Sequence, residues 1–433
     1  MLELLHKLPY NAGHDPQWRE KEPGLREVIR KYPDIPPLVI LKTDLQRRGV
    51  KMTKRASAAV DTKKVAVNVR ANNFENLMGG PTPVGVLLRD GSSVITYVAG
   101  AAEEPFARIR DPYYIDLSTD GKPVIVDDGE VIDEAIYWPR PDYYDKVTRK
   151  GTPMWQVLGA RPQRLEINGY QNCDFWKKGQ PCRYCYLGFL CKMLRGKKNE
   201  FIDLEDAAEA VGEALKQPGR YRSIQLCNGT MLGGAELLDD EVDYYIDILH
   251  RIERYLPGHD AMVQMVATAF NERQLRRLKD ETILTGYTSD IEVLDAEVFQ
   301  HLCPGKANAI GYAEWKNRLF RAVDIFGAGR VTTGIVSGAE FAQPGGFTTE
   351  EEALERCLAE AEDFAKHGVG ICQTVYNNTA PGCALYKQRS QTLEYNIAFL
   401  KGLDAISRRW GVGFEFDDYR TCGNHPNTDL ARI

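Results

Sequence analysis

Three cysteines that lie close together in the chain are the residues best suited to chemistry. Cys173, Cys182 and Cys185 belong to the segment LEINGYQNCDFWKKGQPCRYCYLGFLC, which begins at Leu165. Two residues separate Cys182 from Cys185, so one turn of backbone can bring both thiolates to a common metal centre. Cys173 can fold back as a third ligand.

A set of three thiolates is one ligand short of a closed metal site. Structural zinc normally takes four protein ligands, and an electron-transfer iron–sulfur cluster takes four cysteines. The set therefore indicates a cluster with one coordination position open for a substrate or cofactor. The alternative interpretation is that Cys173 is a core cysteine, and that Cys182, Cys185, Cys191 and one further residue bind zinc.

The cysteine loop resembles the cluster loop of the radical S-adenosylmethionine (SAM) superfamily. In that family three cysteines hold a [4Fe-4S] cluster, and the methionine part of SAM chelates the fourth iron. An aromatic residue commonly precedes the last cysteine of the family's loop, and Tyr184 stands there in CRYC. The commonest family spacing has three residues between the first two cysteines, whereas this chain has eight. The resemblance therefore implies a non-standard loop, and it leaves the subfamily open.

The sequence between 165 and 410 predicts the elements that position this loop. Short apolar runs alternate with amphipathic helical patterns in six units, with strands expected at 165–169, 223–227, 261–268, 289–294, 331–336 and 370–376. Such alternation predicts an α/β fold with a parallel sheet curved as a full or partial barrel. The cysteine loop follows the first strand, and chemistry in such barrels takes place at the carboxyl ends of the strands. The radical SAM family is similar, with a partial (β/α)6 TIM-like barrel.

Two glycine-containing segments resemble SAM-binding parts of the family. After the second strand, GTMLGGAE resembles the GGE-type turn, which would assign Gly233, Gly234 and Glu236 to the amino group of SAM. The alternative is an ordinary glycine turn, with Glu236 as an acidic residue in the first turn of a helix. At the fifth strand, GIVSGAE resembles the strand end that lies along the adenine, which would assign Gly338 to the cofactor.

The fourth and sixth strands carry further candidates. Glu292 lies in the apolar segment SDIEVLD, where a carboxylate is costly unless it is paired or bound to a ligand. The resemblance implies a contact of Glu292 with SAM. Cys372 and Tyr376 of the sixth strand are expected to act in catalysis. The alternative for Cys372 is a core thiol, as for Cys227 and Cys303. Gln373, Asn377 and Asn378 are candidates for substrate contact, although alternation must turn some of this strand toward the helices.

The parts outside the barrel are expected to be accessory. Residues 1–150 predict an arm with one short helix at 23–31, followed by a smaller β-rich domain whose strands include PLVILK at 37–42. Asp90-Gly91 and Asp120-Gly121 suit hairpin turns. The domains are therefore expected at 1–150, 151–410 and 411–433. The tail, 411–433, is expected to close the barrel mouth, and its polar residues include Asp417, Asp418, Tyr419, Cys422 and His425, with Asp418 assigned to catalysis.

Composition limits the classes of function. The chain has 433 residues, a hydrophobic fraction of 43% and a net charge of −6, which predicts a soluble globular protein with no nucleic-acid or anionic-membrane partner. The sequence shows no secretion signal and no apolar span, so a cytoplasmic location is expected. The 10 cysteines then serve as thiols and metal ligands. No second CxxC pair supports an auxiliary cluster, and the N-terminal region lacks the pattern of a cobalamin domain.

The predicted function is that of an enzyme that reductively cleaves SAM at a [4Fe-4S] cluster to start radical chemistry on a small molecule. The resemblance implies an external one-electron donor such as flavodoxin or ferredoxin, and the N-terminal arm is expected to wrap the body or a second copy in a homodimer. The alternatives are a radical SAM enzyme that acts on a peptide or protein, a zinc- or iron-stabilised binding protein, and a barrel hydrolase. Against the hydrolase, the seven histidines show no metal-ligand spacing.

Overall fold

The computed structural model describes residues 22–67, 81–96, 98–101, 111–188, 200–258, 261–377, 384–385, 388, 391–414 and 423–431. At its centre is a sheet in the order β15-β14-β13-β12-β11-β10-β9. Its strands are β9 Gly159–Ala160, β10 Arg164–Ile167, β11 Ser223–Cys227, β12 Met262–Val266, β13 Gly286–Thr288, β14 Val331–Ser337 and β15 Gly370–Val375. Neighbours from β10 to β15 pair in parallel, and β9 pairs antiparallel with β10. The predicted α/β fold with a parallel sheet is confirmed at this level.

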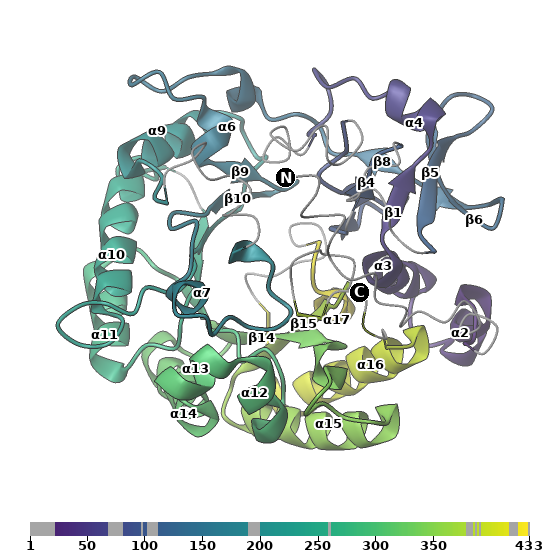
Figure 1. Cartoon of the computed structure of the whole chain (residues 1–433). Helices are drawn as coiled ribbons and strands as arrows, with labels where there is room; N and C mark the ends of the chain where they lie inside the picture. The colour runs from purple at the N-terminus through teal and green to yellow at the C-terminus, as the bar shows by residue number, and fades with distance from the viewer. Residues whose placement is uncertain are drawn as a thin grey trace.

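The major helices lie around the outside of the curled sheet (Figure 1). They are α9 Leu204–Ala214, α10 Asp239–Glu253, α11 Glu272–Glu281, α14 Tyr312–Phe326, α15 Glu350–Lys366 and α16 Leu393–Trp410. Two short helices, α12 Ala296–Leu302 and α13 Pro304–Ala309, stand between β13 and α14. Polar side chains cap the amino-terminal ends of several helices. The Asp203 side chain accepts hydrogen bonds from two backbone amides at the start of α9, and Asn271 and Gln274 form a capping box on α11.

The fourth parallel strand is shorter and earlier than predicted. It covers Gly286–Thr288, whereas the sequence pattern predicted 289–294, and that prediction is wrong. Glu292 has a φ of 73°, a left-handed conformation that ends a regular strand. Only an isolated parallel bridge to Ile335 continues the pairing within the described residues. The apolar alternation was misleading because Ile291 and Val293 are buried beyond the end of the strand.

Two smaller sheets form the N-terminal region. One has the order β4-β1-β5-β6-β7 and the other the order β3-β2-β8. Both predicted hairpin turns are confirmed, since β2 pairs antiparallel with β3 and β5 pairs antiparallel with β6, with Gly91 and Gly121 at φ values of 82° and 81°. The elements are α2 Leu25–Lys31, α3 Pro37–Arg48, β1 Val50–Met52, α4 Lys54–Ala58, β2 Val86–Leu87, β3 Ser93–Val94, β4 Val98–Ala99, β5 Tyr113–Leu117, β6 Pro123–Asp127, β7 Glu130–Glu134 and β8 Ile136–Tyr137.

The strand predicted at 37–42 is wrong, because these residues belong to helix α3. Pro37 occupies the first turn of the helix, where its fixed φ and missing N–H are favourable. Every residue from Val39 to Arg48 is buried, so the apolar run belongs to a helix that is enclosed on all sides. Periodicity cannot distinguish a short apolar run in such a helix from a buried strand.

Helix α17, Pro426–Leu430, packs against both α3 and β15 and covers the β15 edge of the central sheet (Figure 1). The Asn427 side chain accepts a hydrogen bond from Gln373 N at 2.8 Å and donates one to Ile371 O at 2.7 Å. One side-chain amide thus satisfies backbone groups that a neighbouring strand would otherwise pair. Gln46 of α3 donates to Gly423 O at 2.7 Å, which fixes the segment that leads into α17.

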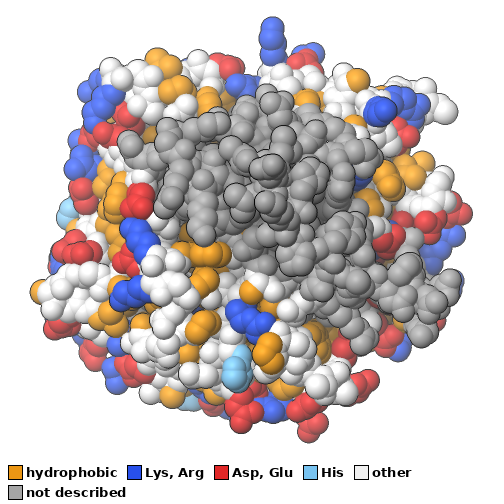
Figure 2. Space-filling model, in the orientation of Figure 1, with side chains coloured by type: hydrophobic (Ala, Val, Ile, Leu, Met, Phe, Trp, Pro, Cys, Tyr) orange, Lys and Arg blue, Asp and Glu red, His pale blue; other side chains and the backbone are white. Residues whose placement is uncertain are grey.

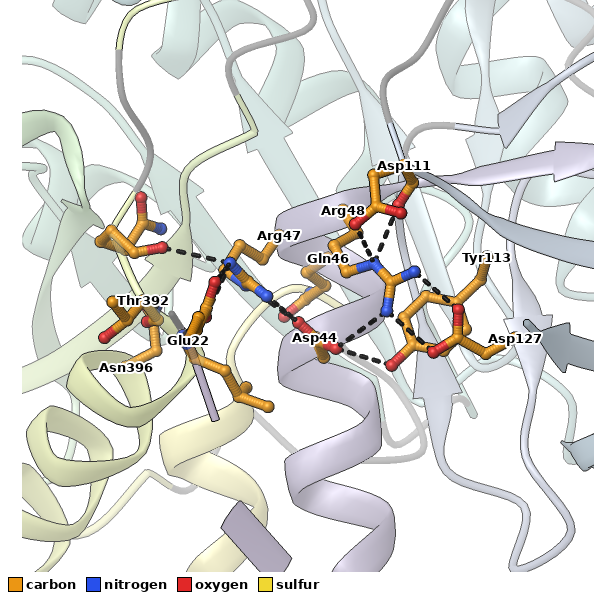
Figure 3. A network of polar contacts seen from close by, with 12 residues as sticks. Glu22, Asp44, Gln46, Arg47, Arg48, Asp111, Tyr113, Asp127, Thr392 and Asn396 are labelled. Atoms are coloured by element: carbon orange, nitrogen blue, oxygen red, sulfur yellow. Dashed lines mark hydrogen bonds and ion pairs between the residues drawn. The ribbon is translucent and has the colours of Figure 1, made fainter. Parts of the chain in front are cut away.

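Charged side chains of α3 also connect it to the N-terminal sheet (Figure 3). Arg48 Nη2 lies 2.7 Å from Asp127 Oδ1, and Arg47 Nη2 lies 2.7 Å from Asp44 Oδ1. Tyr113 donates to Asp44 Oδ2 at 2.6 Å. Burial disfavours the charge of Asp44, but Arg47 and Arg48 hold its pKa below its usual value. The contacts with Asp127 and Tyr113 hold α3 against the small sheet.

Charged side chains of both signs are interspersed around the described rim of the face seen in Figure 2. Among the described residues, no helix has both the length and the apolar character needed to cross a bilayer.

Candidate metal and cofactor site

The three cysteines follow β10 in one loop, at the carboxyl end of the first parallel strand. Cys173 is the N-terminal cap residue of the short helix α7, Asp174–Lys177. Cys185 N donates to Cys182 O at 3.0 Å, so these two cysteines share a tight turn as their spacing predicts. Trp176 Nε1 donates to Cys185 Sγ at 3.4 Å, which links the turn back to α7.

The three thiols influence one another electrostatically. Burial raises the pKa of Cys173, and the neighbouring Cys182 raises it further. Burial likewise raises the pKa of Cys185 to about 12, again with contributions from Cys182 and Cys173. Two such thiols ionise only if a positive centre compensates their charge, which is what a bound metal provides. Within the described ranges, no three His, Cys, Asp or Glu side chains are arranged around a single-ion position.

Cys182 differs because of two residues at the junction of α12 and α13. A hydrogen bond from Cys303 lowers its pKa despite burial, and the charge of Lys306 lowers it further. Cys303 is fully buried, as predicted for a core thiol, but it also contacts Cys182. The backbone joins the two regions, since Arg183 N donates to Leu302 O at 2.8 Å and Gly305 N donates to Gln180 O at 3.1 Å.

Lys306 connects Cys182 to two of the predicted cofactor residues. Its ammonium group donates to Glu292 Oε1 and, at 2.7 Å, to Asp290 O. Burial raises the pKa of Glu292, with Lys306 opposing, and a hydrogen bond joins Glu292 to Tyr184. Burial also raises the pKa of Tyr184 well above its usual value. The structure therefore brings Tyr184 and Glu292 together beside Cys182. The sequence does not point to Lys306, because a lone lysine in a helix gives no signal of this role.

The loop after β11 packs directly on the cysteine loop. A Cβ on Gly229 would lie 1.7 Å from Asn172 O and 2.9 Å from Cys173 Cβ, so only glycine permits this approach. Asp174 N donates to Thr230 O at 2.9 Å, and Leu232 N donates to Asp174 Oδ2 at 2.8 Å. The two loops are thus held together by one backbone–backbone bond and by one bond to the Asp174 carboxylate.

Glu241 fixes the β11 loop from the opposite side, although sequence analysis did not identify it. This fully buried carboxylate accepts from Met231 N at 3.0 Å and from Thr268 N at 3.1 Å. Burial raises the pKa of Glu241 to about 7, against the effect of these N–H donors. A carboxylate in an amphipathic helix such as α10 is usually solvated. The position of Glu241 in the sequence therefore does not indicate that it is buried.

The GGE-type turn lies farther along, at the start of α10. Gly234 has a φ of 117°, and Glu236 forms an ion pair with Arg273 at 3.0 Å on an exposed surface. The contacts with the cysteine loop come instead from the preceding residues Gly229 to Leu232. Gly338 has a φ of 106° at the end of β14, and its amide donates to Glu340 Oε2 at 2.6 Å. The cofactor roles of Gly233, Gly234, Glu236 and Gly338 stay predictions.

The concave face of the central sheet encloses a cavity of about 240 Å³, which Cys372 and Glu292 both line. Asn424 and His425 of the tail also line it. The Gln373 side chain points to the helix side, where it donates to Ser337 Oγ at 3.1 Å. The catalytic roles of Cys372 and of Tyr376, which is 7% exposed, stay predictions. Other candidates lie outside the described residues: Cys191, Asn378, Asp417, Asp418, Tyr419 and Cys422.

Comparison with known proteins gives one sequence relative. No family model matches the chain. The chain is 23% identical over 283 residues to the bacteriochlorophyllide c C-7(1)-hydroxylase of Chlorobaculum limnaeum, a match that covers 59% of this chain and 64% of the hydroxylase. The match therefore spans less than two thirds of that relative.

Comparison with solved structures gives matches of low identity and low TM-score. A radical SAM methyltransferase from Sphaerobacter thermophilus is 13% identical, with 92% of this chain and 96% of that chain covered and a TM-score of 0.38. TsrM from Kitasatospora setae, a radical SAM methyltransferase with cobalamin and a [4Fe-4S] cluster bound, is 13% identical, with 63% and 48% covered and a TM-score of 0.35. Both structures are named as radical SAM methyltransferases, and both TM-scores are below 0.5.

Proposed function

We propose that this chain is a radical SAM enzyme in which Cys173, Cys182 and Cys185 hold a [4Fe-4S] cluster that leaves one iron open for SAM. The observation that supports this most strongly is the position of three thiols in one loop at the carboxyl end of the first parallel strand. Cys182 also contributes to the raised pKa of both other thiols, which supports a shared site for the three.

The residues around these thiols fit such a group. Thiolates are the ligands of iron–sulfur clusters, and hydrogen bonds to the sulfurs tune their potentials. Trp176 donates such a bond to Cys185, and Cys303 stands beside Cys182. When bound, the cluster and SAM supply one-electron reductive cleavage of a carbon–sulfur bond, which yields a radical able to abstract a substrate hydrogen.

The residues of this chain would position the cysteine loop, the β11 loop and Glu292 around the cluster and SAM. Gly229 allows the β11 loop to touch the cysteine loop, and Glu241 holds that loop in place. Lys306 fixes Glu292 beside Cys182. The cavity is lined by side chains of the central sheet and by Asn424 and His425 of the tail.

The finer assignments belong to the same proposal. Residues 151–410 form the catalytic partial (β/α)6 barrel, 1–150 a β-rich accessory region and 411–433 a cover for the barrel mouth. A small molecule is the substrate, an external protein supplies the electron, and the enzyme acts in the cytoplasm. SAM is held by Tyr184, Gly233, Gly234, Glu236, Glu292 and Gly338, and the catalytic candidates are Cys372, Tyr376 and Asp418.

Cleavage of SAM tests the proposal. The full chain is reconstituted anaerobically with iron and sulfide and reduced with dithionite, and the fragments of SAM are then measured by liquid chromatography with mass spectrometry. The wild type and Cys357→Ala are expected to cleave SAM, because Cys357 is a buried thiol on α15, whereas Cys182→Ala is expected to lose at least about 100-fold of the rate. Equal rates in Cys182→Ala and the wild type, or no cleavage by a wild type that carries the cluster, would contradict the proposal.

A further inference from the structure

The long spacer between the first two cysteines of the loop is a folded unit. Eight residues, 174–181, separate Cys173 from Cys182. The first four form the helix α7, and Gly179 ends this helical turn in the left-handed region with a φ of 70°. A spacer of three residues, the commonest length in the family that the loop resembles, is too short to contain such a helix.

Two residues of the spacer fix α7 to the β11 loop and to α13. Asp174 Oδ2 accepts from Leu232 N of the β11 loop at 2.8 Å. The Phe175 side chain is buried, and a Cβ on Gly305 of α13 would lie 2.5 Å from its ring, so the ring packs on the α13 backbone. The next residue, Trp176, therefore has a fixed backbone position.

Trp176 contacts both the first and the third of the three cysteines. Its backbone N donates to Cys173 O at 3.0 Å, and its indole Nε1 donates to Cys185 Sγ at 3.4 Å. The indole lies against the backbone of Gly188, since a Cβ at that residue would lie 2.3 Å from Trp176 Cδ2 and Cε3. These contacts set the direction of the indole N–H toward the Cys185 sulfur.

An N–H donor at a ligand sulfur affects the two oxidation states of an iron–sulfur cluster unequally. A hydrogen bond is stronger when its acceptor carries more negative charge, and reduction adds one electron to the cluster and its thiolates. Hydrogen bonds to the sulfurs are therefore among the factors that set the reduction potential. The bond from Trp176 to Cys185 should favour the reduced form and so raise the potential.

We infer that Trp176 is a positioning residue that raises the reduction potential of the cluster through its N–H bond to Cys185, and that the eight-residue spacer serves to place it. The inference rests on the proposed function in one respect, since the three thiols must hold an iron–sulfur cluster. It does not depend on whether SAM binds to that cluster or is cleaved there.

The reduction potential of the reconstituted full chain tests the inference. A redox titration followed by electron paramagnetic resonance is carried out for the wild type, Trp176→Phe and Trp155→Phe. Trp176→Phe keeps an aromatic ring beside Gly188 but removes the donor. It should shift the one-electron equilibrium about 10-fold toward the oxidised form, which lowers the potential by about 59 mV. Trp155→Phe alters a partly buried tryptophan of α6, Met154–Val157, and should leave the potential unchanged.

Isotope labelling distinguishes the hydrogen bond from an effect of packing. The chain is prepared with a magnetic heavy isotope of nitrogen in the indole of all its tryptophans, and electron–nuclear double resonance is recorded on the reduced cluster. A nitrogen coupling is expected in the wild type and in Trp155→Phe and should be absent in Trp176→Phe. Gly188→Ala, whose new Cβ would displace the indole, should weaken this coupling and lower the potential in the same direction.

The inference is overturned if the potential of Trp176→Phe equals or exceeds that of the wild type, or if the labelled wild type shows no coupling to an indole nitrogen. A cluster whose potential falls in Trp176→Phe, but which neither binds nor cleaves SAM, would contradict the proposed function alone. Cleavage of SAM by a wild type and a Trp176→Phe variant of equal potential would contradict this inference alone. A chain that binds zinc and never a cluster would contradict both.

Discussion

Lys42 Nζ lies 2.8 Å from Asp429 Oδ2, and neither side chain is more than 2% exposed. This buried ion pair joins α3 of the N-terminal region to α17 near the end of the chain. Because α17 also packs on β15, the N-terminal region takes part in covering the edge of the central sheet. The region that sequence analysis treated as accessory therefore contributes to the structure of the barrel itself.

Breaking this pair is expected to be strongly destabilising. Asp429→Asn removes the carboxylate charge that lies 2.8 Å from the buried Lys42 ammonium, which should lower the free energy of unfolding by about 3 kcal/mol. Urea denaturation measures the change. The control is Glu272→Gln in the exposed pair with Arg276, whose side chains are 51% and 60% exposed, and which should change stability by about 0.5 kcal/mol or less. Similar losses in both variants would refute the structural role of the buried pair.

Replacement of Asn427 is also expected to destabilise the protein, because its side chain bonds both a backbone donor and a backbone acceptor of the β15 edge. Asn427→Leu has a similar size but leaves Gln373 N and Ile371 O unpaired, which should cost about 2–4 kcal/mol. Asn427→Asp retains the acceptor for Gln373 N but turns an oxygen toward Ile371 O. It should therefore also destabilise the protein, although it differs by a single group. Unchanged urea midpoints in both variants would count against the edge-covering role of α17.

Much of the fold follows from local patterns, and the exceptions have physical causes. The strands β11, β12, β14 and β15 and their helices appear in the sequence because apolar periodicity and polar caps agree there. Helix α3 did not, because two of its buried charged residues, Lys42 and Arg48, pair with Asp429 and Asp127, which are far away in the sequence. The fourth strand was predicted at 289–294 instead of Gly286–Thr288, because the apolar alternation of 289–294 does not reveal the left-handed conformation of Glu292. No glycine stands at that position to indicate it.

Glu241 should make stability depend on pH. Its pKa is raised by burial from 4.5 to about 7, so the folded state holds a proton that the unfolded state releases between these values. The stabilisation of the folded state by the proton on Glu241 is complete below pH 4.5 and is lost as the pH rises through 7. Relative to Glu241→Gln, the wild type should lose about 3 kcal/mol over this window. Unfolding curves at pH 4.5, 6 and 7.5 measure the difference. The exposed Glu253→Gln should show no such trend, and a flat difference for Glu241→Gln would contradict the prediction.

Gly229→Ala should disturb the cysteine loop specifically. The new Cβ would lie 1.7 Å from Asn172 O, which is a backbone atom that cannot rotate away, so the two loops must separate. After reconstitution we expect less than half of the wild-type iron content, measured colorimetrically with the protein still folded by circular dichroism. Gly413→Ala, where no atom lies within 4 Å of the new Cβ, is the matched control. Full iron loading in Gly229→Ala would show that this contact does not position the loop.

The candidate site was predictable where chemistry lies in a contiguous motif. The spacing of Cys173, Cys182 and Cys185 identified the loop, and an isolated acid in an apolar segment identified Glu292. The sequence does not indicate Lys306 and Glu241, because their roles depend on burial beside residues from other strand–helix units.

Electron paramagnetic resonance of the reconstituted, reduced protein shows whether the cluster has an open iron. Spectra are recorded with and without SAM for the wild type, Cys182→Ala and Cys303→Ala. We expect a [4Fe-4S] signal that changes when SAM is added, that persists in Cys303→Ala and that is absent in Cys182→Ala. Stoichiometric zinc without a cluster, loss of the cluster in Cys303→Ala, or a signal that SAM leaves unchanged would contradict a three-thiolate site with one open iron.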